Sequence, residues 1–240
     1  MRRHCLLLVV PLLLLSAVCR ADEVVVQDDF DGVDLSPDWI VHMDLPPVAQ
    51  GWTYSVAAGS LTVTDVIPDT TGAWSAVRLR RECDAPGGFS LRASLGWSTS
   101  SEPPTNHAMQ ETRVALLDSV GNSIAVACYY DCWRGYRGTR WAQAGSETQE
   151  DAPSSLPFDG WAAIRIERSA GVAEVYWDDQ LLVSGADTSE VRAVELSFWH
   201  YCHLNGSFFG TGAFDSLIVT KPETSVESSS WGYIKSLHRE

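Results

Sequence analysis

The sequence is poor in basic residues and has almost no lysine. Of its 240 residues, 17 are Lys or Arg and 31 are Asp or Glu, which gives a formal net charge of −14 at pH 7. The two lysines, Lys221 and Lys235, both lie near the C-terminus. An acidic chain is repelled by phosphate backbones and anionic lipids, so the composition argues against a nucleic acid or an anionic membrane as partner. With 45% hydrophobic and only 20% charged residues, the composition is nevertheless that of a globular protein.

Long helical periods are absent after the N-terminal region. Apolar and polar residues instead alternate, most clearly over residues 89–97, 163–167 and 194–198, and a period of two is typical of half-buried strands. The other expected strands are residues 61–64, 75–81, 112–117, 123–130, 175–177 and 213–220. The turn signals between strands are Ala58-Gly59, residues 86–88, Gly121-Asn122, Ala170-Gly171 and Asp178-Asp179. About ten short strands predict an all-β fold, a two-sheet antiparallel jelly-roll sandwich.

The one long apolar run lies at the N-terminus. Residues 1–21 combine the basic pair Arg2 and Arg3, an apolar stretch and a small-residue exit that ends at Ala21. This order predicts a secretory signal peptide and therefore a secreted protein, extracellular or periplasmic. Cleavage after Cys19 and an uncleaved signal anchor are the alternatives. Removal of residues 1–21 takes away three arginines and no acidic residue, so the mature chain would carry a net charge of −17.

Two further regions are expected after the signal peptide. Residues 22–220 are predicted to form one domain, which we expect to be monomeric, and no second apolar run predicts a membrane span in the mature chain. Residues 221–240 form a polar linker and a short C-terminal tail. The tail is either a frayed end or a sorting or docking segment.

Export also determines how the cysteines are interpreted. Four remain in the mature chain, Cys83, Cys128, Cys132 and Cys202. An even number in an oxidising compartment predicts disulfides, and the sequence does not choose among the three connectivities. The alternative is a zinc site made of Cys128, Cys132, Cys202 and either His200 or His203, although this spacing matches no common zinc pattern.

Three regions of the sequence together resemble the concanavalin A-like lectin and glucanase superfamily, including its laminin G-like members. They are the acidic and aromatic residues 28–39 with Gly51-Trp52 and residues 59–61, then residues 160–168 and 175–181, and finally residues 213–219. The resemblance covers roughly residues 27–220. It implies two curved antiparallel sheets, adjacent first and last strands, and a concave face that often carries a saccharide groove. Within it, Trp39, Trp52 and Trp161 match the scaffold pattern.

Strand parity proposes residues for such a groove. If the segment after Val194 is a regular strand, Val194, Leu196 and Phe198 face the core and the residues between them face the other way. Aromatic rings suit the C–H faces of sugars, and nearby charged side chains suit their hydroxyls. With aromatic residues from a loop expected after Tyr130, the predicted carbohydrate site consists of Trp133, Tyr136, Trp141, Trp199, Tyr201, Glu111, Arg113 and Glu195. The alternative is that these rings pack under loops or between the sheets.

No catalytic motif accompanies the predicted site. Retaining glucanases of this superfamily carry Glu-x-Asp-x-x-Glu on one strand, and the sequence has no such motif. Glu111 and Glu195 could act as a pair only if their carboxyl groups lay about 5–5.5 Å apart. The sequence therefore favours a non-catalytic, lectin-like domain that binds an oligo- or polysaccharide by aromatic stacking. A protein-binding adhesion module and a divergent glycoside hydrolase are the alternatives.

The resemblance further implies a structural calcium ion on the convex side, near the terminal strands. Carried over to this sequence, its ligands would be Asp29, Asp31 and Asp215. Calcium prefers several carboxylate and carbonyl oxygens, which an acidic cluster can supply. The alternative is a solvated acidic turn.

Overall fold

The computed structural model describes residues 22–44, 53–67, 73–99, 108–131, 134–143, 149–150, 156–202 and 208–222. Within these ranges the chain forms fifteen strands and no helix, which confirms the predicted all-β class. None of the described segments is a helix long and apolar enough to cross a membrane. The strands are β1 (Asp22–Asp28), β2 (Ile40–Asp44), β3 (Thr53–Ala57), β4 (Ser60–Ile67), β5 (Ala73–Ala85), β6 (Phe89–Thr99), β7 (Ala108–Leu117), β8 (Ser123–Asp131), β9 (Tyr136–Ala142), β10 (Gln149–Glu150), β11 (Asp159–Ser169), β12 (Val172–Trp177), β13 (Gln180–Ala186), β14 (Val191–Cys202) and β15 (Phe208–Pro222).

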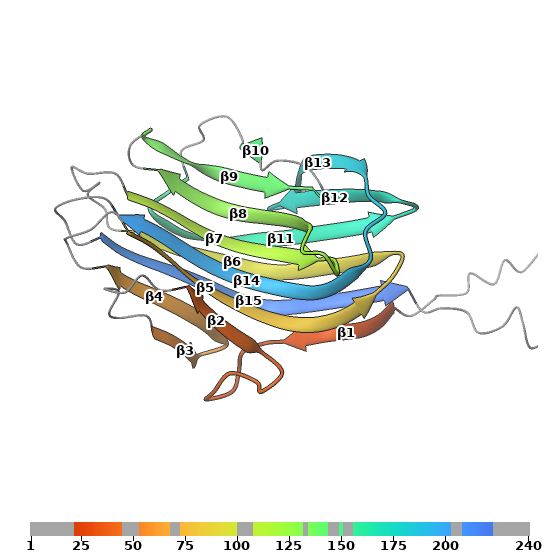
Figure 1. The fold of residues 1–240 in the computed structure, drawn as a ribbon, viewed down its shortest axis with the longest axis horizontal. Helices are drawn as coiled ribbons and strands as arrows, with labels where there is room; N and C mark the ends of the chain where they lie inside the picture. Colours follow the sequence, from red (N-terminus) through yellow and green to blue (C-terminus); the bar gives the residue numbers. More distant parts are fainter. Residues whose placement is uncertain are drawn as a thin grey trace, which may run out of the picture. The chain divides into compact units, whose positions relative to one another are not determined.

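The strands form two antiparallel sheets, and the strand axes of the two sheets are nearly aligned (Figure 1). Sheet A has the order β13-β12-β11-β6-β15-β4-β3, with β1 also paired to β15. Sheet B has the order β10-β9-β8-β7-β14-β5-β2. The first and last described strands pair directly, from Asp22 opposite Pro222 to Asp28 opposite Leu217. The predicted jelly-roll sandwich and its adjacent terminal strands are therefore confirmed.

Alternating side chains of both sheets fill the core between them. Leu91 and Leu95 of β6 and Leu196 and Phe198 of β14 are completely buried in one hydrophobic cluster. Because Val194, Leu196 and Phe198 are all in this cluster, the predicted parity of β14 is confirmed. The other face of β14 is thereby directed away from sheet A.

Three tight turns have the geometry that hairpins favour. Both central residues have positive φ in Ala58-Gly59 (53° and 81°), Ala170-Gly171 (51° and 76°) and Asp178-Asp179 (46° and 62°). Such type I′ turns match the right-handed twist of the strands they join. The predicted turns at these positions are confirmed.

Strand β15 changes its hydrogen-bonding partner along one edge. It pairs with β4 from Phe208 to Phe214 and with β1 from Leu217 to Pro222. Its other edge pairs with β6, with an irregularity between Asp215 and Ile218, and Ser216 has a positive φ of 53°. Bulges re-aim side chains, and here the bulge places Asp215 at the junction of β4, β15 and β1.

A buried ion pair fastens one end of sheet A. Arg168 Nη1 lies 3.2 Å from Asp187 Oδ2, and the two side chains are 4% and 1% exposed. Arg168 also donates to the carbonyl oxygens of Gly87 and Ser189, so it links the β5–β6 turn to the segment before β14. We refer to this arrangement as the Arg168–Asp187 clip.

Candidate functional site

The outer face of sheet B, which is directed away from sheet A, carries most of the predicted site residues. Trp199 lies opposite Glu111, and Glu111 lies opposite Tyr129 on the next strand. The next row across the same face consists of Ser197, Arg113, Ala127 and Arg140. Residues paired across strands project from the same face of a sheet. Residues of β14, β7, β8 and β9 are thus brought together.

An ion pair crosses β8 in the middle of this face. Arg140 Nη1 on β9 lies 2.9 Å from Glu111 Oε2 on β7, and the side chains are 20% and 6% exposed. The Arg140 guanidinium carbon lies 4.1 Å from the centroid of the Tyr129 ring. Ala127, opposite Arg140, is too small to obstruct the long side chain. The ion pair and the cation–π contact together hold Tyr129 in place.

A second ion pair lies at the neighbouring end of β8. Arg134 Nε is 2.9 Å from Asp131 Oδ2, and the Arg134 backbone N–H donates to Asp131 Oδ1 at 3.1 Å. The guanidinium carbon of Arg134 lies 5.1 Å from the centroid of Tyr136, whose hydroxyl donates to the Thr139 carbonyl at 3.0 Å. Tyr136, a predicted ligand residue, is only 4% exposed. It supports its neighbours and does not offer an open ring.

Trp199 and Tyr201 keep part of their surface accessible. Both are half-buried, and the Trp199 ring lies 6.0 Å from Tyr129 with the planes tilted by 45°. This packing fixes one side of the indole on the buried tyrosine. The remaining surface of each ring is where a ligand could stack.

Arg113 and Glu195 are the polar members of the predicted site that lack a charged partner among the described residues. Arg113 Nη2 donates to Ser123 Oγ at 2.6 Å, and its buried Nε has no acceptor in the described chain. Arg113 lines a small depression together with Glu111 and Arg140. Glu195 is half-buried on the same face, opposite Ala115.

The structure corrects one predicted ligand residue and leaves another outside its described part. Trp141 lies in β9, where the sequence predicted a loop, and it is opposite Val126 on the inward side. Its side chain packs against the main core, so the prediction that it faces a ligand is wrong. Trp133 lies outside the described residues.

The strand register also tests the proposed carboxylate pair. Glu195 lies opposite Ala115, four positions beyond Glu111 on β7. At about 3.3 Å per residue these positions are roughly 13 Å apart along the strand. Paired glycosidase carboxyl groups lie about 5–5.5 Å apart in retaining enzymes and about 6.5–9.5 Å apart in inverting ones. Glu111 and Glu195 therefore do not form a catalytic pair.

Two of the cysteines predicted to form disulfides are free thiols. Cys83 on β5 and Cys128 on β8 are both buried in the core, and β14 and β7 lie between their strands. Burial raises the pKa of Cys83 to about 11 and also raises the pKa of Cys128. Because both thiols are free in the described structure, the prediction that Cys83 and Cys128 form disulfides is wrong. Cys132 and the side chain of Cys202 lie outside the described part.

Of the predicted calcium ligands, Asp215 lies at the bulge in β15. The Asp29 carbonyl oxygen is near the β3–β4 turn, 3.8 Å from where a Cβ on Gly59 would lie. Asp29 Oδ2 accepts from Gln27 at 3.2 Å, Asp215 Oδ1 accepts from the Ser216 hydroxyl at 3.1 Å, and Asp31 is exposed. Within the described ranges no three His, Cys, Asp or Glu side chains are grouped to hold a metal ion. Calcium here would need backbone carbonyl oxygens, and the site stays a prediction.

Sequence reasoning missed several residues with functional potential. Tyr129, Asp131 and Arg140 complete the outer face of sheet B, but β8 is buried on both faces and shows no alternation. Trp161, which the resemblance assigned to the scaffold, is 53% exposed on the outer face of sheet A. Its position could have been found, because Ala162 and Ile164 are the buried positions of β11 and Trp161 has the opposite parity.

No family model and no curated protein matches the chain. Solved structures do match it at the level of the fold. A sialidase is similar over 83% of this chain and 19% of its own, with 11% identity and a TM-score of 0.51. An endo-β-galactosidase from Clostridium perfringens that releases GlcNAcα1-4Gal is similar over 84% of this chain and 63% of its own, with 14% identity and a TM-score of 0.55. The catalytic domain of an endo-1,3-β-glucanase from Thermotoga petrophila RKU-1 is similar over 85% of this chain and 100% of its own, with 12% identity and a TM-score of 0.52.

Proposed function

Because the described chain has the concanavalin A-like jelly-roll fold, we propose that it is a non-catalytic, lectin-like protein. Its ligand is an oligo- or polysaccharide bound on the outer face of sheet B. The observation that carries this proposal is the position of Trp199, a half-buried ring directly beside the charged row of Arg113 and Arg140. An aromatic ring suits the C–H face of a sugar, and the charged row suits its hydroxyls.

The residues of the site have different roles. Trp199 and Tyr201 provide the stacking surface, since both rings keep exposed area. Arg113 is the polar residue best suited to reach a ligand, because the described chain gives its guanidinium only the Ser123 hydroxyl. Glu111 and Arg140 are occupied with each other and position Tyr129 under Trp199.

The names of similar structures support a saccharide as the ligand class. The endo-β-galactosidase and the endo-1,3-β-glucanase are named for action on glycans. The predicted signal peptide supports export to a place where polysaccharides occur. We propose a secreted monomer, and N-terminal sequencing of the exported protein would begin at Asp22 if cleavage follows Ala21.

A divergent glycoside hydrolase is the second candidate, favoured by one pair of residues. Glu111 and Asp131 are both buried on this face, at diagonal positions of β7 and β8. Such positions lie about 7 Å apart on neighbouring strands, and inverting enzymes hold their two carboxyl groups about 6.5–9.5 Å apart. Each carboxylate is engaged by an arginine, which favours binding over catalysis. Hydrolysis that is lost in both Glu111→Gln and Asp131→Asn would replace the lectin-like function by this one.

A glycan array tests the proposal, with purified protein and the Trp199→Ala variant applied in parallel. We expect the wild type to bind a defined group of glycans and Trp199→Ala to lose most of that signal. Tyr54→Ala is the matched control, because Tyr54 is an exposed aromatic residue of sheet A. No glycan bound, with a protein captured from host surface extract instead, would support the adhesion alternative and contradict the proposal.

A further inference from the structure

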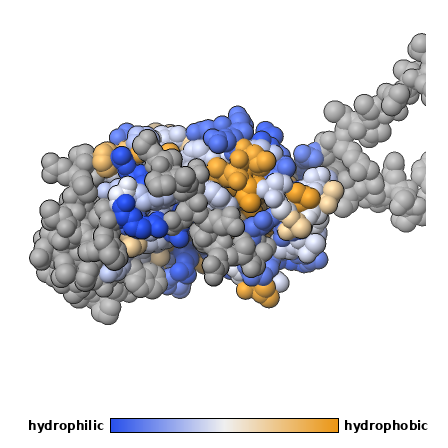
Figure 2. All heavy atoms as spheres, turned by 90° about the horizontal axis from the view of Figure 1, so that it is seen from above, coloured by the Kyte–Doolittle hydropathy of each residue, from blue (hydrophilic) through white to orange (hydrophobic). Residues whose placement is uncertain are grey.

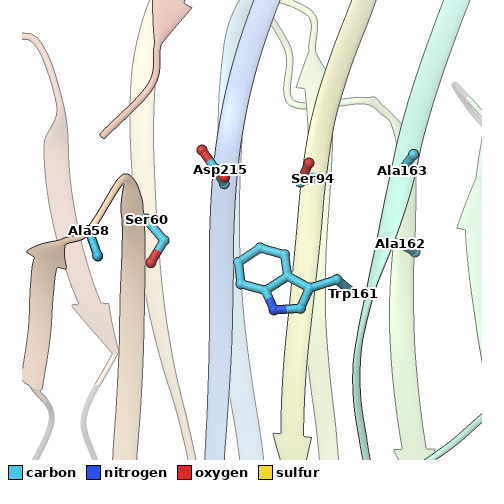
Figure 3. Close-up of a pocket in the computed structure, with 7 residues that line it drawn as sticks. All are labelled: Ala58, Ser60, Ser94, Trp161, Ala162, Ala163 and Asp215. Carbon is cyan, nitrogen blue, oxygen red and sulfur yellow. The ribbon is translucent and has the colours of Figure 1, made fainter. Parts of the chain in front are cut away.

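The outer face of sheet A has a pocket that the proposed function does not use. Its volume is about 350 Å³, and its lining includes Trp161, Asp215, Ser94 and Ser60 (Figure 3). They come from four strands that lie side by side in sheet A, in the order β11, β6, β15 and β4. These strands are not consecutive in the chain. The volume lies within the range of small-ligand sites, about 300–1,000 Å³.

Trp161 lies flat on the sheet because the next strand has a glycine beneath it. Gly96 on β6 is directly opposite Trp161, and a Cβ at Gly96 would meet three indole atoms at 2.8–3.0 Å. Nearly equal distances to three atoms of the six-membered ring mean that Gly96 lies under the ring face. Figure 3 shows the indole extending from β11 across the strand that carries Ser94, toward the strand of Asp215. With the ring 53% exposed, its opposite face is open to solvent.

A row of polar side chains runs beside the ring. Asp215 lies opposite Ser94, and Ser94 lies opposite Ala163 on the far side. In Figure 3 the Asp215 carboxylate, the Ser94 hydroxyl and the Ser60 hydroxyl project from the face that carries the indole. The Asp215 position follows from the bulge in β15, which re-aims this side chain. The pocket therefore pairs a flat apolar platform with hydrogen-bonding groups along one side.

We infer that this pocket is a second saccharide subsite, in which a neutral hexopyranose stacks its C–H face on Trp161 and its hydroxyls contact Asp215, Ser94 and Ser60. Apart from the indole, the apolar lining consists of the small residues Ala58, Ala162 and Ala163, which cannot enclose a lipid chain, whereas a sugar ring needs only one flat contact. The Asp215 carboxylate and the net charge of −14 disfavour an anionic sugar. The ligand class rests on the proposed function, but the location does not, since sheets A and B form the two opposite layers of the sandwich.

Fluorine NMR of protein labelled with 5-fluorotryptophan tests this subsite. The Trp161 resonance is assigned with Trp161→Phe and the Trp199 resonance with Trp199→Phe. The probes are hexasaccharides of β-1,3-linked glucose, β-1,4-linked glucose and β-1,4-linked N-acetylglucosamine. We expect at least one of them to shift the Trp161 resonance to saturation.

Variants of the pocket separate its parts. Ser94→Ala and Gly96→Ala should each raise the dissociation constant measured at Trp161 several-fold, the latter because the new methyl group lifts the ring from the sheet. Ser94 is chosen because Asp215 is also a predicted calcium ligand. Tyr54→Ala should leave the titration at Trp161 unchanged.

The two proposals can fail separately. A probe that shifts Trp199 to saturation but leaves Trp161 unmoved overturns the second subsite and leaves the proposed function standing. A probe that shifts Trp161 alone supports the subsite and contradicts the site on sheet B. If none of the three probes moves Trp161, the inference of a neutral hexopyranose subsite is wrong.

Discussion

Arg140 on β9 reaches across β8 to form an ion pair with Glu111 on β7, at 2.9 Å, with its guanidinium over the Tyr129 ring. Tyr129 in turn packs against Trp199, whose centroid is 6.0 Å away. The accessible indole is therefore positioned by a charged pair that is itself almost buried. Binding and stability should be linked through these four side chains.

Breaking this ion pair should destabilise the fold. Glu111→Gln removes one charged partner from this nearly buried ion pair, and such a removal costs about 3 kcal/mol or more. Urea unfolding monitored by far-ultraviolet circular dichroism measures the loss. The double variant Glu111→Gln with Arg140→Met should recover part of it, because neither charge then remains. A loss of less than about 1 kcal/mol in Glu111→Gln would show that the pair contributes little.

The Arg168–Asp187 clip should matter for stability but not for ligand binding. Asp187→Asn removes a partner from a pair whose side chains are 4% and 1% exposed, so we expect a loss of about 3–5 kcal/mol in urea unfolding. The matched control is Asp84→Asn, since Arg192 and Asp84 form an ion pair that is 42% and 64% exposed. That variant should lose no more than about 1 kcal/mol. Similar losses in the two variants would refute the structural role of the clip.

The buried thiol of Cys83 should make the protein sensitive to alkali. Burial raises its pKa from 9.0 to about 11, so the fold favours the neutral thiol. This stabilising contribution is fully present below pH 9 and is lost as the pH rises toward 11, at about 1.4 kcal/mol per pH unit. Between pH 8.5 and 10.5 the wild type should lose about 2 kcal/mol more than Cys83→Ala in urea unfolding. Parallel losses in the two proteins would contradict this account.

The predicted calcium site gives a thermal test. If calcium binds near Asp215, adding it to chelator-treated protein should raise the melting temperature, because a ligand that binds only the folded state stabilises it. Asp215→Asn should abolish the increase. An unchanged melting temperature in the wild type would mean that the residues around the bulge form an acidic turn without a metal ion.

The fold was predictable largely because one face of most strands is buried. In β6 and β14, apolar residues at alternate positions indicate which side of the strand faces the core. The turns Ala58-Gly59 and Ala170-Gly171 were predicted from their glycines, which favour the positive φ that the structure shows. Strand β9 was not predicted, because Arg137, Gly138 and Arg140 interrupt the alternation of apolar and polar residues in this segment. The interior of β8 was ambiguous because both of its faces are covered.

The site was predictable only in part, since strand parity predicts which face of the sheet a side chain occupies but not which residues it contacts. It placed Glu195, Trp199, Glu111 and Arg113 on one face, but it could not show that Arg140 spans a whole strand to reach Glu111. Nor could it show that Cys83 and Cys128 are separated by two strands, since that depends on the order of strands in the sheet. Trp161 shows that a residue assigned by resemblance to the scaffold can lie on the surface.

The most direct test of saccharide binding on sheet B is isothermal titration calorimetry with the glycan bound most strongly on the array. The site predicts that Trp199→Ala binds this glycan about tenfold more weakly than the wild type, a loss of about 1.4 kcal/mol, as expected for a lost aromatic stacking contact. Tyr54→Ala should bind like the wild type. Equal affinities of the wild type and Trp199→Ala would contradict the proposed function.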